Sequence, residues 1–356
     1  MSFELIKINN FRNIPEAIIE PESERNIFVG ENGAGKTSVI EAIYSVARGR
    51  SFRSRYRKPV IKEGESSSLI FSTWKNYSGI QSKIGIERKK ERTRIRINGQ
   101  NIARLSILGQ LIPLQLLSPQ SINIFSNGPT NRRKLMDWGV FHVEPSFYSL
   151  WNRYLNTLKQ RNAALRSGKK EVANAFAYSL AELAAQIDSI RSDYFNKLNA
   201  LLLTSIKPQK PLIDVTVNYY RGWSNKKELL DLMQEKLLID LKRGYTSVGP
   251  QFSDLKFTCN SKKLDESLSN GEKKLLIFLF KLAQIDHLNQ LRPRETIFLI
   301  DDVYSELSPT FQNIVNHSIS NLPNQVFLTT PDPAHISSLT EHNKYRLFHV
   351  EHGCIL

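Results

Sequence analysis

The sequence is poor in the features that mark secreted, zinc-binding and membrane-spanning proteins. Its two cysteines, Cys259 and Cys354, lie far apart and outside any C-x-x-C or Cys/His cluster, which argues against a disulfide framework and a zinc site. No stretch approaches the roughly 20 apolar residues of a membrane span, and the first residues lack the basic and apolar regions of a signal peptide. Internal repeats and low-complexity tracts are also absent. We therefore expect a soluble, cytoplasmic protein.

Acidic residues are also relatively scarce. The 356-residue chain has 49 Lys and Arg against 34 Asp and Glu, a net charge of +15. Residues 50–104 alone contain 15 basic and four acidic residues. Such concentrated positive charge favours a polyanionic partner, because Lys and Arg bind phosphates and release counterions. We interpret the segment as a nucleic-acid contact; a solvated basic face and an acidic protein partner are the alternatives.

The hydrophobic pattern of the first third is that of strands with one early helix. Residues 3–8 and 27–29 have strand patterns, and apolar residues at helical spacing follow from Val39 to Val46. From about residue 69 to 102 the pattern is again that of strands. Its clearest part is Arg94-Ile95-Arg96-Ile97-Asn98-Gly99, where Asn-Gly favours a type I′ hairpin turn and the arginines face away from the isoleucines.

The middle of the chain has helical periodicity. Apolar stripes over residues 147–158 and 176–201, separated by a polar break at 166–170, predict an antiparallel helical hairpin. Strand patterns return near 213–220, 255–259, 296–300 and 325–329, and a helix is expected over about 271–289. We therefore predict an α/β fold in three segments: a head with a β-rich basic lobe over 1–126, an inserted helical arm over 127–210, and the rest of the head over 211–356.

The early strand and helix are joined by a glycine-rich loop, Gly30-Glu31-Asn32-Gly33-Ala34-Gly35-Lys36-Thr37, which fits the P-loop pattern G-x-x-x-x-G-K-[ST]. Glycines let consecutive backbone N–H groups point at phosphate oxygens, and the following helix N-terminus adds partial positive charge. Lys36 would reach the β- and γ-phosphates, Thr37 would hold Mg²⁺, and Ser38 would assist. An ordinary Gly-rich turn is the alternative, which the position between strand and helix disfavours.

A second part of a nucleotide site is the apolar run Ile297-Phe298-Leu299-Ile300, which ends in Asp301 and Asp302. A buried strand that ends in acids places them at the carboxyl edge of the sheet, where the Mg²⁺ of a P-loop lies. A strand followed by a merely acidic turn is the alternative. The P-loop elsewhere in the chain favours the Mg²⁺ site.

A third motif, Leu268-Ser269-Asn270-Gly271-Glu272, directly precedes the predicted helix over 271–289. A Ser-x-Gly at the start of a helix offers a hydroxyl and free N–H donors to an anion. A simple N-cap with an acidic first turn is the better explanation when the motif is considered alone. Its place between the P-loop and the acidic strand favours a role in nucleotide binding.

These three motifs, in this order, resemble the ABC-type ATPase heads of SMC proteins. More closely, the whole chain resembles the RecF family of bacterial recombination and gap-repair proteins. The resemblance rests on residues spread from end to end: Asn10-Phe11-Arg12-Asn13, Gly49-Arg50-Ser51-Phe52-Arg53, Arg132-Arg133, Asp137-Trp138, Leu158-Lys159-Gln160-Arg161-Asn162, and Asp301-Asp302 with Ser305-Glu306-Leu307.

The resemblance implies a head-to-head homodimer. ATP would lie between the P-loop of one subunit and the third motif, residues 268–272, of the other; in this family the third motif is called the signature. Residues Gly30 to Ser38 would bind ATP, Thr37 and Asp301 would hold Mg²⁺, and Ser269 and Gly271 would contact the γ-phosphate from the partner. Asp302 stands where many ABC ATPases have a catalytic Glu. Its shorter side chain would place a general base further from the attacking water, which predicts slow hydrolysis.

Several positions depart from the family or stay open. The residue of the Q-loop is either Gln120 or Gln115, and Arg12 is either near the nucleotide or an ordinary surface cation. The departures are Asn270 for a common Gly, Ser308 for a usual Asp, Gln251-Phe252 for His-Arg, and Thr329-Thr330 in place of a switch histidine. The first three put the dimer-contact loop and any role of the His-Arg pair in doubt.

From the resemblance we expect an ATP-dependent DNA-binding protein of recombinational repair and replication restart. It would dimerise on ATP, bind gapped single-strand/double-strand DNA and promote recombinase loading with RecR-like and RecO-like partners, with a weak DNA-stimulated ATPase as a switch. An ABC-type ATPase that drives a DNA motor, an SMC-like machine or a transporter is the alternative, and a P-loop kinase is a third. Candidate DNA contacts are Arg53, Arg55, Arg57, Lys58, Arg94 and Arg96, with Arg132 and Arg133 as further candidates; each is otherwise a solvated cation.

Overall fold

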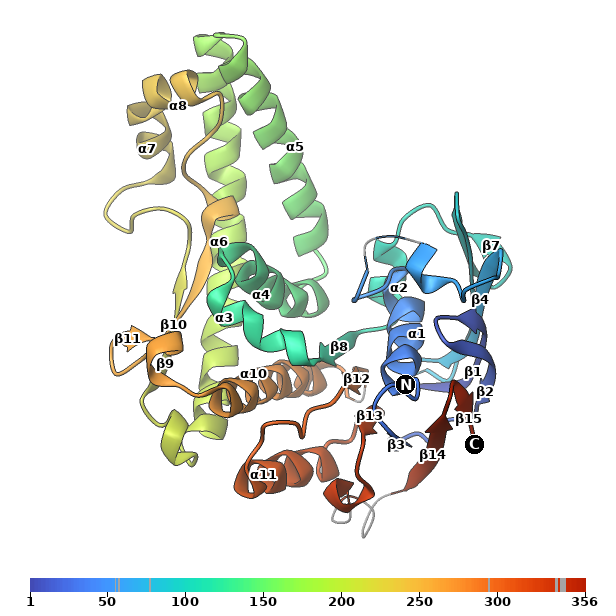
Figure 1. Cartoon of the computed structure of the whole chain (residues 1–356). Coiled ribbons are helices and arrows are strands. Elements are labelled where there is room, and N and C mark those ends of the chain that lie inside the picture. The colour runs from blue at the N-terminus through green and yellow to red at the C-terminus, as the bar shows by residue number, and fades with distance from the viewer. Residues whose placement is uncertain (55, 57, 77, 294, 337–338, 340–343) are drawn as a thin grey trace. The chain divides into compact units, whose positions relative to one another are not determined.

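The computed structural model describes residues 1–54, 56, 58–76, 78–293, 295–336, 339 and 344–356 (Figure 1). The chain divides into two compact units: unit 1 is Met1–Ser121 with Asn270–Leu356, and unit 2 is Ile122–Ser269. None of the helices within the described residues is long and apolar enough to cross a membrane.

Unit 1 is built on two sheets. Its strands are β1 (Ser2–Phe11), β2 (Ile14–Ile19), β3 (Arg25–Val29), β4 (Ser67–Lys75), β5 (Gln81–Lys89), β6 (Thr93–Ile97), β7 (Gln100–Asn101), β8 (Leu114–Leu117), β12 (Ile297–Ile300), β13 (Val326–Thr330), β14 (Tyr345–Glu351) and β15 (Cys354–Ile355). Its α-helices are α1 (Lys36–Arg48), α2 (Ser106–Leu111), α10 (Asn270–Leu291) and α11 (Pro309–Ser320). The first sheet is antiparallel with the order β2-β1-β4-β5-β6-β7, and the second has the order β15-β14-β3-β13-β12-β8.

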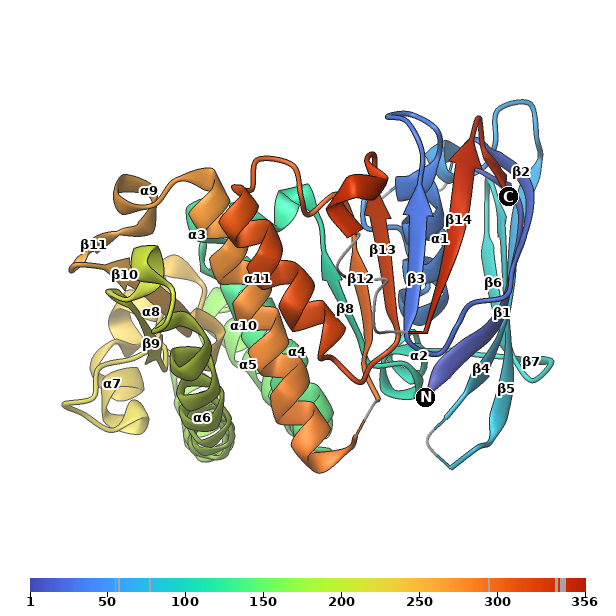
Figure 2. The same cartoon turned by 90° about the horizontal axis from the view of Figure 1, so that it is seen from below.

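Helix α1 lies between the two sheets and joins them into one core (Figure 2). Val39, Ile40 and Ile43 are fully buried, as the helical spacing of apolar residues predicts. The same hydrophobic cluster includes Trp74 of the antiparallel sheet and Phe327 of the parallel one. The start of α1 is therefore fixed from both sides, and with it the loop that precedes α1.

The order of strands in the second sheet decides which loops meet. Strand β13 lies between β3 and β12, and all three run parallel. Their carboxyl ends therefore share one edge of the sheet, although β3 and β12 are far apart in the sequence. Ligands of open α/β sheets bind outside this edge.

The basic hairpin has the predicted turn. Strands β6 and β7 pair with Ile97 opposite Gln100, so the loop is the two residues Asn98 and Gly99. Both have positive φ angles, 50° and 83°, as a type I′ turn requires. Ile95 is buried and Arg96 is exposed, which confirms the predicted alternation of faces.

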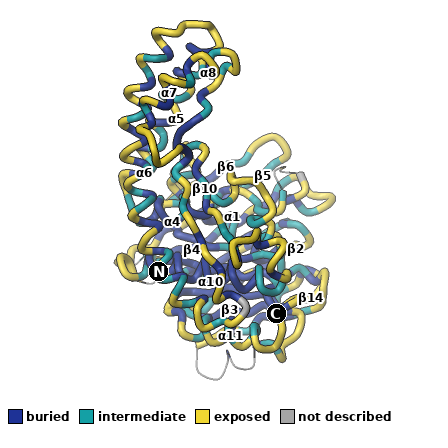
Figure 3. Tube along the Cα trace, turned by 90° about the vertical axis from the view of Figure 1, so that its left-hand side faces the viewer, coloured by how far each residue is buried: buried dark blue, intermediate teal, exposed yellow. Residues whose placement is uncertain are grey.

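Unit 2 is mainly helical. Its α-helices are α3 (Asn123–Ser126), α4 (Pro129–Val143), α5 (Phe147–Arg166), α6 (Lys170–Ile206), α7 (Leu229–Glu235), α8 (Leu237–Arg243) and α9 (Leu264–Ser267). Strands β9 (Val215–Tyr220), β10 (Asp254–Cys259) and β11 (Lys262–Lys263) form a small antiparallel sheet. Helices α5 and α6 form the predicted antiparallel hairpin, with buried and exposed residues alternating along both (Figure 3).

Residues 211–269 belong to the same compact unit as the helical hairpin, whereas the segments expected from the sequence placed them with the C-terminal part of the head. The reason is a set of polar contacts that residues 211–269 make with α4 and α6. The Tyr219 hydroxyl of β9 donates to Asp188 of α6 at 3.0 Å, and Arg132 of α4 forms two hydrogen bonds with Asp254 of β10 at 2.8 and 3.0 Å. These contacts join segments that are far apart in the sequence.

A buried ion pair fixes α8 to the hairpin. The Arg161 guanidinium donates to Asp240 at 3.0 Å and to the Thr246 hydroxyl at 2.6 Å, and both charged side chains are fully buried. Asn162 accepts hydrogen bonds from the backbone and hydroxyl of Thr246, each at 2.8 Å. Arg161 and Asn162, which carry part of the family resemblance, therefore have a structural role within unit 2.

We predict that Arg161→Met lowers the free energy of unfolding of unit 2 by about 3–5 kcal/mol, because Asp240 would remain as a buried charge without its counterion. Urea unfolding followed by circular dichroism measures the loss. Lys159→Met, at an exposed position of the same helix, serves as the control and should change little. Arg161→Met combined with Asp240→Leu should recover part of the loss; an equal loss in the double variant and the single variant would contradict the explanation.

Candidate functional site

The glycine-rich loop between β3 and α1 has backbone angles that require glycine. Gly33 and Gly35 have φ angles of 87° and 122°, a region that L side chains rarely adopt. A Cβ at Gly30 would lie 2.1 Å from the Val350 carbonyl oxygen, so this glycine permits close packing of two backbones. The motif is therefore a strand, a compact loop and a helix, as the P-loop pattern predicts.

Lys36 points back into this loop. Its Nζ donates to the carbonyl oxygens of Gly30 and Glu31 at 2.5 and 2.8 Å. Burial lowers the pKa of the Lys36 ammonium, while the nearby carboxylates of Asp302 and Asp301 raise it. The ammonium is thus held at the centre of the loop, close to the acidic end of β12.

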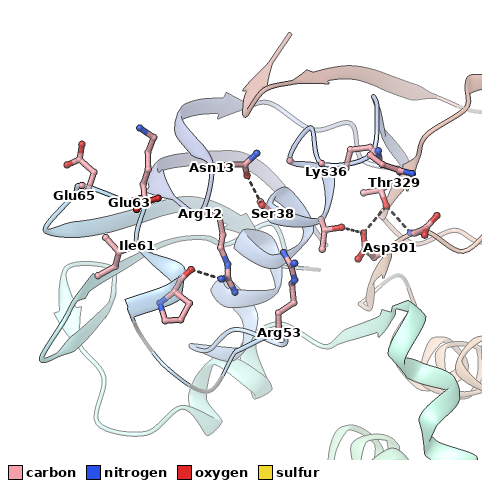
Figure 4. Close-up of a pocket in the computed structure, with 18 of the residues that line it drawn as sticks. Arg12, Asn13, Lys36, Ser38, Arg53, Ile61, Glu63, Glu65, Asp301 and Thr329 are labelled. Atoms are coloured by element: carbon pink, nitrogen blue, oxygen red, sulfur yellow. Dashed lines mark hydrogen bonds between the residues drawn. The ribbon is translucent and has the colours of Figure 1, made fainter.

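Asp301, directly after β12, is the residue where three elements meet (Figure 4). Its Oδ1 accepts hydrogen bonds from the hydroxyls of Thr37, at 3.0 Å, and Thr329, at 2.9 Å. Thr37 lies in the first turn of α1 and Thr329 near the end of β13, so the P-loop helix, β12 and β13 are joined through one carboxylate. The predicted meeting of Thr37 and Asp301 is present in the structure.

The Asp301 carboxylate carries an electrostatic cost. Burial raises its pKa, hydrogen bonds from Thr329 and Thr37 lower it, and the neighbouring Asp302 raises it again. A buried carboxylate that lacks a full counterion is suited to a cation, because the cation replaces lost hydration. An oxygen-rich pair of Thr37 and Asp301 fits Mg²⁺, which binds to proteins through few side chains and keeps other oxygen ligands.

A cleft of about 1130 Å³ opens in front of these residues. Its lining from the P-loop is Asn32, Gly33, Gly35, Lys36, Thr37 and Ser38. Asp301, Asp302 and Thr329 line it from the parallel sheet, while Arg12, Asn13, Arg53, Lys90 and residues 59 and 61–65 line it from other parts of unit 1. Figure 4 shows Arg12, Asn13, Lys36, Arg53 and Asp301 among the residues around this cleft.

Asn13 supports the P-loop, a role that the sequence did not indicate. Its side chain accepts a hydrogen bond from the Ser38 hydroxyl at 2.8 Å and donates to the Ala34 carbonyl at 3.2 Å. It also lies against Gly35, where an added Cβ would be 2.9 Å from its amide nitrogen. Ser38 is therefore buried and engaged in holding the loop.

Arg12 is not an ordinary surface cation. Its guanidinium forms two hydrogen bonds with Glu41 at 3.0 and 2.7 Å and a further one with the Pro59 carbonyl. Glu41 is fully buried on α1 and also accepts from Ser51. The Arg53 guanidinium lies 3.7 Å from the same carboxylate but is 46% exposed, so Arg53 is held more loosely at the cleft.

Asp302 has an unusual conformation. Its φ angle is 50°, and its backbone N–H donates to the Thr329 hydroxyl at 2.9 Å. Thr329 therefore accepts from Asp302 and donates to Asp301. Thr329, one of the two threonines at the end of β13, thus fixes both acids, and its place at the carboxyl end of the strand next to β12 was the available signal.

The other predicted nucleotide contacts lie elsewhere. Gly271 is in the first turn of α10, and neither Gly271 nor Ser269 is among the residues that line the cleft. Gln115 is buried in β8, where it donates to Gln284 at 2.8 Å and accepts from Lys281 at 3.1 Å. Gln120 is exposed just beyond the end of β8, so of the two glutamines it has the more accessible side chain.

The candidate DNA contacts differ in accessibility. Arg96 is exposed, Arg94 is partly exposed opposite Glu87, and Arg53 lines the cleft. Arg55, Arg57 and the side chain of Lys58 lie outside the described residues. Arg132 binds Asp254 and three backbone carbonyls, and Arg133 donates to the Ser253 carbonyl, so both have structural partners in unit 2.

Two departures from the family pattern have a local explanation. The Ser308 side chain accepts a hydrogen bond from the Phe311 backbone and is the N-cap of α11. Ser and Asp are comparable N-caps, so the replacement keeps the helix start. Gln251 accepts a hydrogen bond from the Tyr154 hydroxyl and donates to the Val248 carbonyl at 3.0 Å, which places its side chain in the packing of unit 2.

Comparison with known sequences gives one consistent group. The sequence model of the RecF/RecN/SMC N-terminal domain family matches residues 2–355. The DNA replication and repair protein RecF of Shewanella baltica (strain OS223) is 36% identical over 355 residues, which cover 99% of this chain and 98% of the relative. RecF of Shewanella denitrificans is 35% identical over 356 residues, with the same coverage.

Solved structures show the same fold. A structure of the recombination mediator protein RecF with ATP, described as part of the RecFOR pathway, superposes with a TM-score of 0.84 at 23% identity, covering 99% of this chain and 96% of that one. An Smc head bound to the C-terminal winged-helix domain of ScpA superposes with a TM-score of 0.64 at 15% identity, covering 100% and 96%. These similarities confirm the predicted fold class.

We predict that Asp301→Asn raises the thermal stability of the ligand-free protein. Burial holds the pKa of Asp301 above that of an unfolded Asp, so its contribution to stability is fully present only below the unfolded pKa and is lost as pH rises through the folded pKa. Asparagine stays neutral and still accepts the two threonine hydrogen bonds. The gain in melting temperature should therefore be largest at neutral and alkaline pH and shrink on acidification; a gain that is independent of pH would contradict this.

Proposed function

This chain belongs to the RecF family, and on that premise we propose that it is an ATP-dependent DNA-binding protein of recombinational repair and replication restart. The observation that carries the proposal is the meeting of Lys36, Thr37 and Asp301 at one edge of the parallel sheet. A lysine within a loop of inward-facing amides, beside a hydroxyl and a carboxylate, is suited to a nucleoside triphosphate with Mg²⁺. The structure of a RecF protein with ATP supports this choice of nucleotide.

The proposed binding of ATP uses groups already in place. Lys36 would exchange its two carbonyl partners for phosphate oxygens, and the backbone N–H groups of Gly33 to Thr37 would donate to them. Thr37 and Asp301 would hold Mg²⁺, which supplies positive charge at the phosphates. Arg53, which is exposed and only loosely paired with Glu41, is free to turn toward an anion in the cleft.

The site is proposed to be complete only in a homodimer. Ser269 and Gly271 do not line the cleft, so in the proposed dimer the signature of a second subunit would complete it. Asp302 would act on the attacking water at the shared site. Because aspartate is one methylene shorter than the usual glutamate, we expect slow hydrolysis and a long-lived ATP state, with the ATPase serving as a switch.

The proposed DNA partner is gapped DNA with single-strand/double-strand junctions. The support is the net charge of residues 50–104 together with the exposed Arg96 on the edge hairpin. Sequence-independent binding of this kind relies on phosphate contacts and falls steeply with salt. Following the RecFOR context of the solved RecF protein, RecR-like and RecO-like proteins are the proposed partners, and recombinase loading is the proposed outcome.

An ABC-type ATPase that drives a DNA motor is the second candidate. It would use the same P-loop and acidic strand but requires rapid turnover. The short side chain of Asp302 disfavours this candidate. Fast ATP hydrolysis that is insensitive to DNA would favour it.

We predict that ATP creates both the dimer and DNA affinity, and that Lys36→Met abolishes both. The reason is that methionine keeps most of the length of the unbranched side chain but removes the charge that would contact the phosphates. Multi-angle light scattering and fluorescence anisotropy with gapped duplex, with and without ATP, measure the two effects. Lys197→Met, an exposed position on α6, is the matched control. If the wild type binds DNA equally without ATP and remains a monomer, the switch mechanism is wrong.

We further predict that Arg96→Ala weakens binding to gapped DNA uniformly across sequences and reduces the slope of log affinity against log salt by about one. The arginine would contact a phosphate, and a protein that makes one phosphate contact fewer releases fewer counterions when it binds DNA. Anisotropy titrations at several salt concentrations give the slope. Arg94→Ala should have a smaller effect, because this side chain is only partly exposed, and Lys197→Ala should have none.

A further inference from the structure

Lys274 lies in the first turn of α10, three residues after Gly271, and its side chain is almost fully buried. Its Nζ donates to the Ser305 carbonyl at 2.5 Å and to the Ser305 hydroxyl at 3.0 Å, and it lies 3.2 Å from a Glu306 carboxylate oxygen. Lys274 is therefore fixed to the loop between β12 and α11, residues 301–308. This loop begins with the two acids of the site.

The loop that Lys274 holds has a strained backbone. Asp302 and Glu306 have φ angles of 50° and 66°, in the left-handed region that non-glycine residues seldom occupy. Such conformations persist only where surrounding contacts determine them. Within the loop, the Ser305 hydroxyl donates to the Asp302 carbonyl at 3.2 Å, so the residue that Lys274 binds is itself hydrogen-bonded to Asp302.

A second contact joins the same two segments. A Cβ at Gly271 would lie 2.9 Å from the Glu306 carbonyl oxygen, so the start of α10 and the loop touch backbone to backbone. Close packing against the loop thus favours glycine at position 271, in addition to the proposed contact of Gly271 with a nucleotide. Gly271 and Lys274, three residues apart on α10, therefore both contact the loop.

We propose that Lys274 is a positioning residue that holds the loop 301–308 against the start of α10. The signature motif and Asp302 would then move together when nucleotide binds. The inference rests on the proposed function, in which the signature engages ATP from the neighbouring subunit. A shift of the signature motif on nucleotide binding would then be transmitted to Asp302 by two links. These are the hydrogen bonds from Lys274 to Ser305 and the hydrogen bond from Ser305 to Asp302. Hydrolysis at one site would thereby depend on the occupancy of the other.

The hydrogen bonds to Ser305, rather than the ion pair, carry this link. The Glu306 side chain is 60% exposed, and ion pairs with an exposed partner contribute little in water. The two bonds to Ser305 are made by a nearly buried ammonium, where each lost partner is costly. Variants at Lys274 and Glu306 therefore separate the two contributions.

The test compares full-length wild type with Lys274→Met, Lys274→Arg and Glu306→Gln, and uses Lys227→Met, an exposed lysine in unit 2, as the control. Hydrogen–deuterium exchange of the peptides covering 301–308 is measured without nucleotide and with ATP. In Lys274→Met we expect these amides to exchange at least about tenfold faster, as expected when a local opening is no longer opposed. Lys274→Arg should restore most of the protection, and Glu306→Gln and Lys227→Met should match the wild type.

Steady-state ATP turnover and the affinity for a fluorescent ATP analogue distinguish positioning from general damage. Because Lys274 touches neither the P-loop nor the cleft lining, we expect Lys274→Met to keep its nucleotide affinity within about twofold and to lose about tenfold in kcat, the result of a misplaced catalytic group. Unchanged exchange in the loop would overturn the proposal. So would faster exchange with an unchanged kcat, because Asp302 would then not depend on Lys274.

The exchange measurement also separates this inference from the proposed function. If the wild type fails to bind ATP or to dimerise, the proposed function fails, and the coupling to nucleotide fails with it. The comparison of exchange without nucleotide would still show whether Lys274 holds the loop. If the wild type binds ATP and dimerises but the loop and the signature turn gain protection independently, the proposed function stands and the coupling is wrong.

Discussion

The site depends on one buried carboxylate. Asp301 accepts hydrogen bonds from Thr37 and Thr329, and through them it joins the P-loop helix to two central strands. This arrangement follows from the strand order, which places β13 between β3 and β12. The same arrangement is costly, because burial raises the pKa of Asp301 and disfavours its charged form. A binding site whose ligand-free state bears such a cost gains stability when a cation arrives, which is how ligand binding becomes linked to the stability of the fold.

The two compact units satisfy their buried charges in different ways. In unit 2, Arg161 is paired with Asp240, and Arg191 forms two hydrogen bonds with Asp137 at 2.9 and 2.8 Å and lies over the Trp151 ring. Each of these cations is paired with a carboxylate of unit 2 and fixes the helical hairpin. In unit 1, Lys36 is held by backbone carbonyls, and Arg53 is only loosely paired with a carboxylate that Arg12 already binds. Both Lys36 and Arg53 line the cleft, where an anion would supply a further partner.

The sequence predicted the parts of the site that depend on local chemistry. The glycine loop, Thr37, Asp301 and the Asn98-Gly99 turn require particular residue types at fixed spacing, so a single sequence reveals them. Asn13, Glu41 and Thr329 were not predicted as site residues, because their roles come from contacts with residues 25, 29 and 28 positions away. The extent of unit 2 was missed for the same reason: residues 211–269 pack on the helical hairpin through side chains that carry no local signal.

The departures from the family pattern show which features the geometry requires. Ser308, where an aspartate is usual, caps α11, and Thr329, in the Thr329-Thr330 pair that stands in place of a switch histidine, supplies both a donor and an acceptor. Thr329 has no group that titrates near neutral pH, so the hydrogen bonds that hold Asp301 and Asp302 do not depend on a protonation state at this position. The positions of the two acids therefore depend on hydrogen bonds and on the conformation of the backbone. The loop that carries Asp302 has two residues with positive φ angles, Asp302 and Glu306.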